Sequence, residues 1–303
     1  VCGGGGRGAE DVRGLTEPDR KGTVRVEENL AIADLTQELH DKGLVDYPWL
    51  CKFYCWYSHA EDKIDPGTYE LNNLYDYHAL VNGMIASTGV RASVTLTIPE
   101  GYECKDIFAL LEENGVCTAQ ALEEASASYE FDYDFLSDLP YGEKNRLEGY
   151  LFPDTYEFYK KHNAKNALGK LIDAFADRID EDAFASSKAK SMGYSMKDVV
   201  IIASLIEKET DGTDQRDIAS VIYNRLQKPG ETAGLLQIDA SLLYGLPDHT
   251  GAITNADKAV DTPYNLYLHK GLPPTAIANP RSAALQAAKD PNDTDHYYHA
   301  FAN

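Results

Sequence analysis

The most apolar stretch of the chain runs from residue 198 to residue 210, with the sequence DVVIIASLIEKET. Its hydrophobic positions cover almost every side of a helix, which is typical of a helix buried inside a domain. Glu207 follows one turn after Ala203 and two turns after Val200, so on a helix its side chain projects from the same apolar face. The pattern therefore predicts a buried helix that carries a carboxyl group near its end.

Burial would give this carboxyl group a chemical consequence. Loss of hydration favours the protonated form, which is what a general acid working near neutral pH needs. The alternative interpretation is structural: Glu207, followed by Lys208 and Glu209, begins a solvated helix end. Spacing alone leaves both interpretations open.

A strand followed by a helix occurs twice in the first half of the chain. VRVEENLAIADLTQELHDKGLV begins at Val24, and LTIPEGYECKDIFALLEENGVC begins at Leu96. Each copy has alternating apolar positions, then apolar positions about four apart, then a glycine where the helix should stop, Gly43 or Gly115. The pattern indicates repeated binding or spacing modules, with a chance match of two unrelated units as the alternative.

The remaining segments predict a mixed α+β chain. Residues 1–22 contain GGGG and no periodicity, so we expect a flexible leader, with structure beginning near Thr23. Pro153 should keep residues 146–158 extended with a turn. Residues 66–71 favour a turn into a strand, and the predicted helices are residues 77–89, 164–192, 216–226 and 281–289, with 119–139 helical and then irregular.

Composition narrows the classes of partner. The chain has 303 residues, enough for two or three domains, and a net charge of −21. That charge argues against nucleic acid and against electrostatic binding to anionic membranes, whereas a polysaccharide is compatible with it. The 20 tyrosines suit sugar rings and give weak support.

Cysteine and histidine spacing indicates neither a disulfide scaffold nor a metal site. The five cysteines are too few and too irregular for a scaffold, and Cys51 and Cys55 favour neighbours on a helix over metal ligands. His296 and His299 lack clustered Cys or acidic partners, and the sequence has no glycine-rich phosphate loop. We expect no cofactor and no metal.

No run approaches the ~18 apolar residues that span a bilayer. If the natural protein has a membrane anchor, we expect it to lie outside this sequence.

Four stretches stand in order along the chain: LEGYLFPDTYEF (147–158), ASLIEKET (203–210), IASVIYNRL (218–226) with LQIDASLLYGL (236–246), and TPYNLYLHKGLPPTAIANP (262–280). Together they resemble the YceG-like endolytic murein transglycosylases, which cleave peptidoglycan glycan strands at the cell surface. TLTIPEGY (95–102) and PGTYEL (66–71) are similar to the amino-terminal part of that family, so the likeness covers about residues 23–295.

The resemblance implies that Glu207 is the catalytic acid and base. It also implies a LysM-like module before a mainly helical, lysozyme-like catalytic domain. An amino-terminal helix is expected to anchor the protein in the membrane, with these domains outside the cytoplasm. Peptidoglycan is the expected substrate, and cell-wall synthases are candidate partners. We expect a leader at 1–22, a first strand–helix module at 23–92, a second, LysM-like module at 93–145 and the catalytic domain at 146–303.

A lytic transglycosylase needs one carboxyl group where most glycosidases use two. The acid protonates the glycosidic oxygen and then takes the proton of the C6 hydroxyl, which closes a 1,6-anhydro ring. Two alternatives stay open. One is a hydrolytic muramidase that uses Glu207 with Asp239 or Glu148, and the other is a non-catalytic peptidoglycan-binding or divisome scaffold.

Other residues of the motifs are candidates for glycan contacts, each with a turn, cap or buried structural role as the alternative. They are Glu148, Asn224, Gln237, Asp239, Tyr264, Asn265 and Tyr267. The sequence departs from the family pattern at Ile238, Ala240 and Ser241, where Ser, Pro and Thr are expected, and at Thr275 and Arg281, which replace glycines. We expect these changes to alter loop shape and to leave Glu207 in place.

Overall fold

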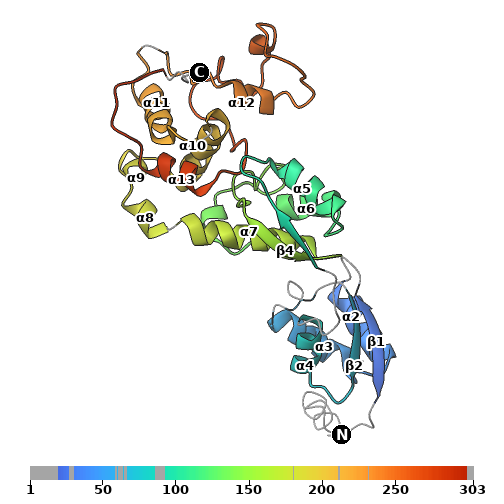
Figure 1. Ribbon diagram of the computed structural model, residues 1–303. Coiled ribbons are helices and arrows are strands. Elements are labelled where there is room, and N and C mark those ends of the chain that lie inside the picture. Colours follow the sequence, from blue (N-terminus) through green and yellow to red (C-terminus); the bar gives the residue numbers. More distant parts are fainter. Residues whose placement is uncertain are drawn as a thin grey trace. The chain divides into compact units, whose positions relative to one another are not determined.

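The computed structural model describes residues 20–26, 31–58, 60, 64, 67–85, 93–179, 181–210, 212–230 and 232–298. Among these residues helices predominate, with two small two-stranded sheets (Figure 1), so the predicted α+β class is confirmed. The chain forms two compact units. The first comprises the residues up to Thr95 with Leu111–Thr118 and Glu157–Ala167, and the second comprises Leu96–Leu110, Ala119–Tyr156 and the residues from Leu168 onward.

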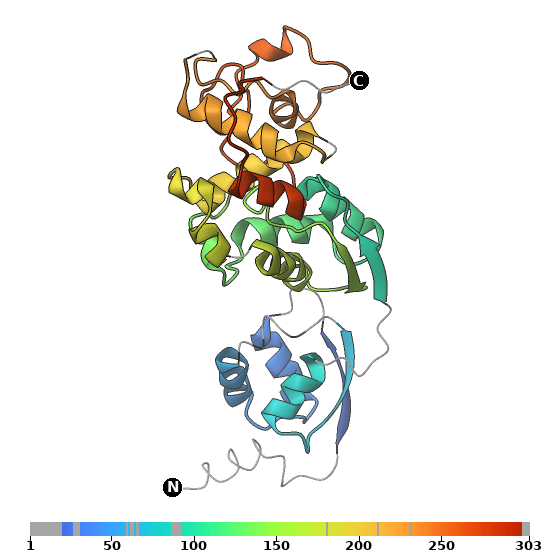
Figure 2. The ribbon, with the colours of Figure 1, turned by 60° about the vertical axis from the view of Figure 1, so that its left-hand side comes forward.

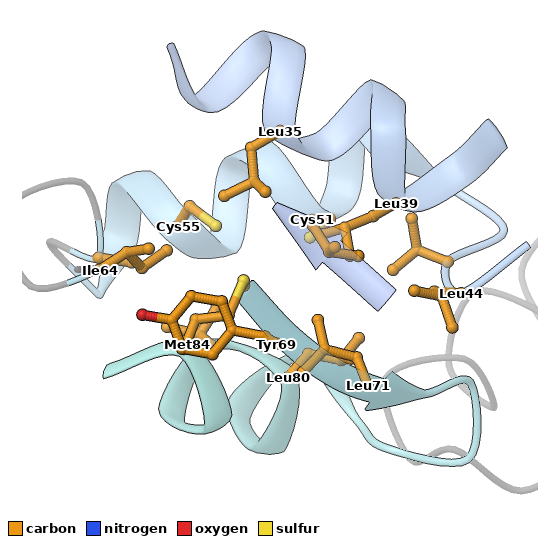
Figure 3. Close-up of a cluster of buried hydrophobic side chains, with 14 of the residues drawn as sticks. Leu35, Leu39, Leu44, Cys51, Cys55, Ile64, Tyr69, Leu71, Leu80 and Met84 are labelled. Carbon is orange, nitrogen blue, oxygen red and sulfur yellow. The ribbon is translucent and has the colours of Figure 1, made fainter. Parts of the chain in front are cut away.

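The first unit is built on an antiparallel strand pair. Strand β1 (Lys21–Val26) begins at Lys21 rather than Thr23 and pairs with β2 (Gly67–Asn72), with Val24 opposite Tyr69. Alternate strand residues pack against three helices in one core (Figure 3). These helices are α2 (Ile32–Asp41), α3 (Pro48–Tyr57) and α4 (Tyr77–Ile85).

Two sequence predictions for this part of the chain are confirmed. Cys51 and Cys55 lie on α3, and both are buried in the core. The strand at residues 66–71 corresponds to β2. Of the leader predicted at residues 1–22, residues 1–19 lie outside the described residues, and so does the glycine end of the 77–89 helix.

The repeated strand–helix–glycine order is present in both copies. The second copy consists of β3 (Ser93–Thr97) and α5 (Cys104–Glu113). Gly43 and Gly115 follow α2 and α5 with φ values of 64° and 71°, the left-handed conformation that ends helices. The strand partners differ, because β1 pairs with β2 whereas β3 pairs with β4 (Thr155–Tyr159). The predicted domain boundaries remain predictions.

The helices that follow the repeats are α6 (Ala119–Ser128), α7 (Ala164–Ile179), α8 (Glu181–Ala185), α9 (Lys188–Ser191), α10 (Met196–Glu209), α11 (Gln215–Gln227), α12 (Asp239–Tyr244) and α13 (Ser282–Lys289), with 3-10 turns at Asp134–Leu136 and Asp257–Ala259. The helical stretch predicted at 164–192 is divided into three helices, and the Ser187 side chain caps the third by accepting from the Lys190 amide. Residues 146–158 are turns followed by β4, as Pro153 predicted. No helix in the described part of the chain has the length and apolarity that crossing a bilayer requires.

Helix α10 is the central element of the second unit. Its start is fixed by a capping box, in which Ser195 accepts from the Asp198 amide and Asp198 accepts from the Ser195 amide. Every residue from Val199 to Glu207 is buried, because α11, α12 and α13 contact the helix; α13 lies beside it in both ribbon views (Figures 1 and 2). The predicted buried helix is confirmed.

Gly149 allows the chain to approach α10 closely. Its φ is 95°, and a Cβ atom there would lie 2.6 Å from Cγ1 of Val200 and 2.7 Å from Cβ of Ala276. We expect Gly149→Ala to lower the free energy of unfolding by about 2–3 kcal/mol, because the substitution combines backbone strain with overpacking. Urea unfolding measures this change.

Gly169→Ala is the matched control. Gly169 lies within α7, and a Cβ atom there would meet no atom of the described residues within 4 Å. Alanine should raise the free energy of unfolding by about 0.5–1 kcal/mol at this helical position. Equal effects of the two substitutions would contradict the packing argument.

Candidate active site

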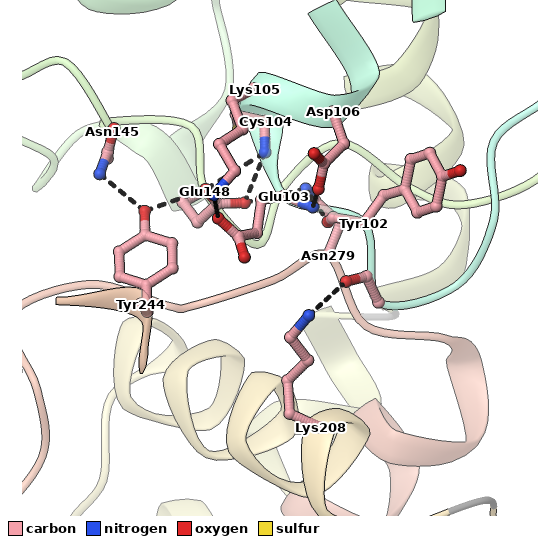
Figure 4. Close-up of polar contacts among 11 residues, drawn as sticks. Tyr102, Glu103, Cys104, Lys105, Asp106, Asn145, Glu148, Lys208, Tyr244 and Asn279 are labelled. Carbon is pink, nitrogen blue, oxygen red and sulfur yellow. Dashed lines mark hydrogen bonds and ion pairs between the residues drawn. The ribbon is translucent and has the colours of Figure 1, made fainter. Parts of the chain in front are cut away.

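Glu207 lies on the last turn of α10 with a side chain that is 2% exposed. The turn after β3 covers it: Gly101 has a φ of 74°, and a Cβ atom on Gly101 would be 3.5 Å from Cγ of Glu207. Lys208, the next residue, is exposed and donates from Nζ to the Gly101 carbonyl at 3.1 Å (Figure 4). The burial predicted for Glu207 is confirmed, and the solvated-end interpretation is wrong for this residue.

The carboxylate of Glu207 is held by Arg281, the residue before α13. The Arg281 Nε donates to Oε1 at 2.9 Å and to Oε2 at 3.1 Å, Nη2 donates to Oε1 at 2.7 Å, and the backbone amide donates to Oε2 at 2.9 Å. Nη1 lies 3.1 Å from Oε2 of Glu100. One guanidinium therefore bridges a buried carboxylate and a half-exposed one. The sequence marked Arg281 only as a departure from the family pattern.

Glu148 supplies a second buried carboxyl group, 3% exposed. The Cys104 amide donates to its Oε1 at 3.0 Å, and the Tyr244 hydroxyl donates to its Oε2 at 3.0 Å (Figure 4). Burial raises the pKa of Glu148 to about 8, against the hydrogen bonds from Tyr244 and the Cys104 backbone, which lower it. Glu148 therefore holds a proton at neutral pH.

Asn279 joins the segments around both carboxyl groups, and its side chain is fully buried. Its Oδ1 accepts from the amides of Gly149 and Leu151 at 3.0 and 2.9 Å. Its Nδ2 donates to Oε1 of Glu148 and to the Tyr102 carbonyl, both at 3.0 Å. Asn279 thus fixes the segment that ends in Arg281. Asn279 lies within one of the motifs, but its hydrogen-bond partners are more than a hundred positions away in the chain. Its neighbours in the sequence therefore did not indicate this role.

Glu148 and Tyr264 share a cavity of about 410 Å³ beside α10, whose wall also includes Asn145, Val200 and Thr275. The Tyr264 ring packs against the Tyr244 ring with centroids 4.9 Å apart. The Tyr264 and Thr275 hydroxyls are 2.8 Å apart. The cavity thus combines an aromatic wall with hydrogen-bonding groups, a combination that suits sugar rings.

Three further candidates form a separate cluster around the start of α12. The Tyr267 hydroxyl donates to Oδ1 of Asp239, which is exposed, and Nζ of Lys258 lies 4.2 Å from the centre of the Tyr267 ring. Gln237 is exposed, has a φ of 54°, and donates from its amide to the Leu266 carbonyl at 3.0 Å. Their glycan contacts remain predictions.

The two asparagine candidates make hydrogen bonds to backbone carbonyls. Asn265 is fully buried and donates from Nδ2 to the carbonyls of Lys258 and Val260 at 3.0 and 2.7 Å. Asn224, on α11, donates to the carbonyls of Thr294 and His296 at 2.7 and 3.0 Å. Both side chains thus hold loop carbonyls in place, and their glycan contacts remain predictions.

The described residues contain no group of three His, Cys, Asp or Glu side chains placed to hold a metal.

The YceG-like family model matches residues 24–303. A Bacillus subtilis protein named endolytic murein transglycosylase is 29% identical over 300 residues, which cover 93% of this chain and 79% of that protein. A Streptococcus pneumoniae protein of the same name is 27% identical over 91% of this chain, and the chain spans about half of its length, 53%. A crystal structure described as a YceG-like protein of Listeria monocytogenes has a TM-score of 0.56 and 28% identity, over 92% of this chain and 93% of that one. Since the family match extends over nearly the whole sequence, the chain belongs to the YceG-like family.

Proposed function

We propose that this protein is an endolytic peptidoglycan lytic transglycosylase that cleaves MurNAc–GlcNAc strands and leaves 1,6-anhydro-MurNAc ends. The observation that carries the proposal is Glu207, a carboxyl group on the last turn of a buried helix with a 2% exposed side chain. The names of the curated relatives support the same substrate and reaction.

Glu207 acts twice in this reaction. As an acid it gives its proton to O4 of the leaving GlcNAc while the bond from C1 of MurNAc to that oxygen breaks. As a carboxylate it then takes the proton of the C6 hydroxyl of the same MurNAc, whose oxygen bonds to C1 and closes the anhydro ring. The proton returns to Glu207, and the reaction consumes no water.

The state of Glu148 favours this mechanism over hydrolysis by two carboxylates. A hydrolase needs its second carboxyl group ionised, as a nucleophile or as the base that activates water. The pKa of Glu148 is raised to about 8 by burial, so this group is protonated where such a role would need a charge. Asp239 is exposed and accepts a hydrogen bond from the Tyr267 hydroxyl, in the cluster around α12.

The proposal extends to the setting of the enzyme. Peptidoglycan lies outside the cytoplasmic membrane, so the protein acts on that side, with a membrane anchor in the natural protein and cell-wall synthases as candidate partners. The strand–helix segments serve as LysM-like modules that bind glycan or space a lysozyme-like catalytic domain.

The test is digestion of purified peptidoglycan and of glycan strands freed of peptides by an amidase, with a muramidase digest as reference. Mass spectrometry should find fragments with anhydro ends, each one water lighter than the corresponding muramidase product. Products of muramidase mass would establish hydrolysis instead. Binding to cell wall without soluble fragments would establish the scaffold.

A further inference from the structure

The guanidinium of Arg281 places the proposed acid in the wrong state for its first step. A general acid must carry a proton, yet Glu207 accepts three hydrogen bonds from the Arg281 side chain, at 2.9, 3.1 and 2.7 Å. Such a two-oxygen contact with a guanidinium is a strong charge-assisted arrangement, and it occupies both oxygens of the Glu207 carboxyl group. Arg281 must therefore leave Glu207 before the glycosidic oxygen can be protonated.

Glu100 offers the guanidinium a second position. Its Oε2 is already 3.1 Å from Nη1 of Arg281, and its side chain is 49% exposed, compared with 26% for Arg281 and 2% for Glu207. The guanidinium thus spans the path from the buried carboxylate to solvent. A short movement toward Glu100 would keep it paired while it released Glu207.

Two charged residues that follow Glu207 in the chain, Lys208 and Asp214, have other partners. Lys208 binds the Gly101 carbonyl at 3.1 Å. Asp214, just before α11, accepts from the Thr210 hydroxyl at 2.6 Å. Glu209 follows on α10 and is half-buried. Arg281 is the cation in direct contact with Glu207 among the described residues, so it is the group able to control the proton on Glu207.

We propose that Arg281 is a positioning residue that acts as a latch on Glu207, with Glu100 as its second partner. Without substrate, Arg281 occupies both oxygens of Glu207. Glycan binding moves the guanidinium onto Glu100, and Glu207 takes one proton from solvent and becomes the acid. Each turnover returns that proton to Glu207, so uptake is needed only when the latch opens. This inference rests on the proposed function.

The first half of the proposal is tested without substrate, by thermal unfolding of wild type and Arg281→Gln at pH 5 and pH 8. Removing Arg281 leaves a buried carboxylate unpaired at pH 8, whereas at pH 5 that group can take a proton. The loss of Tm should therefore be several degrees larger at pH 8. In a Glu207→Gln background, the effect of Arg281→Gln should be the same at both pH values.

The second half is tested by the pH dependence of glycan release. In Arg281→Gln the pH profile of activity should move toward higher pH than in wild type, because a cation no longer occupies both oxygens of Glu207. Glu100→Gln should slow release several-fold, because the guanidinium loses its second partner, and Arg281→Gln should remove that defect in the double variant. The pH profile of Arg281→Lys should lie between those of wild type and Arg281→Gln, since a lysine ammonium keeps the charge but lacks the planar, two-pronged geometry of a guanidinium.

Arg178→Gln is the matched control. It removes an arginine–carboxylate pair with Asp154, 3.2 Å long and exposed on both sides, and should leave the pH profile unchanged.

Three results would overturn the latch. They are a Tm loss in Arg281→Gln that is equal at pH 5 and pH 8, a lowered rate at every pH with an unchanged profile, and a Glu100→Gln variant as active as wild type. If no variant and no wild-type sample released glycan, the proposed function would fail. The Tm comparison would then still decide whether Arg281 pairs with the Glu207 carboxyl group in the free protein.

Discussion

Glu207→Gln should lower the rate of glycan release by about a thousandfold or more and leave the fold intact. Proton transfer by a positioned group is worth roughly 10²–10⁴ in rate, and here one group serves both as acid and as base. Glutamine matches the side-chain volume, and its carbonyl oxygen can still accept from the Arg281 amide, which lies 2.9 Å from Oε2 in the present structure. The guanidinium keeps Glu100 at 3.1 Å.

The measurement is the initial rate of soluble muropeptide release from purified peptidoglycan, with Tm recorded for every sample. Glu113→Gln is the matched control, because it makes the same change at an exposed position on α5 and should release glycan at the wild-type rate. A Glu207→Gln variant that folds and keeps more than a tenth of the wild-type rate would remove Glu207 from the mechanism.

The local pattern of apolar residues was sufficient to predict the elements whose position depends on burial of a single continuous segment. The apolar run 198–206 predicted α10, and the position of Glu207 relative to Ala203 and Val200 predicted its burial, because helix geometry converts spacing into a shared face. The repeated strand–helix–glycine order was also visible, since Gly43 and Gly115 end their helices through backbone conformation.

The environment of the site could not be predicted in this way, because it is assembled from separated segments. Arg281 lies 74 positions after Glu207, and Glu148 is reached by Tyr244 across 96 positions. The only local signal for Arg281 was that a cation replaced an expected glycine next to a helix start. Nothing in its neighbours indicated that the cation would contact Glu207.

Short elements were missed for a related reason. Helix α12 has six residues, too few for a 3.6-residue period to emerge, and it is not among the helices that the sequence predicts. The Ser187 cap divides a stretch whose charge pattern indicated continuous helix. Asn265 is buried because its side chain donates to backbone carbonyls of its own loop, those of Lys258 and Val260. The sequence did not distinguish this position from one that lines a substrate cleft.

The buried acid of Glu148 should make the stability of the protein depend on pH. Burial raises its pKa in the folded state from 4.5 to about 8. Between these values the unfolded chain has released this proton and the folded chain still holds it, so folding takes up a proton. The free energy of unfolding should therefore fall as pH rises from about 5 to about 8 and level off above, by roughly 4–5 kcal/mol from this group.

Glu148→Gln should remove this dependence, because glutamine matches the protonated acid: an oxygen can accept from the Cys104 amide and Asn279, and an amide can donate to Tyr244. At pH 5 variant and wild type should be nearly equal in stability, and at pH 9 the variant should be the more stable by about the amount that wild type has lost. Urea unfolding at pH 5, 7 and 9 measures both, with Glu113→Gln following wild type as control. Parallel curves for Glu148→Gln and wild type would show that Glu148 is ionised in the folded protein and is therefore able to serve as a second carboxylate in catalysis.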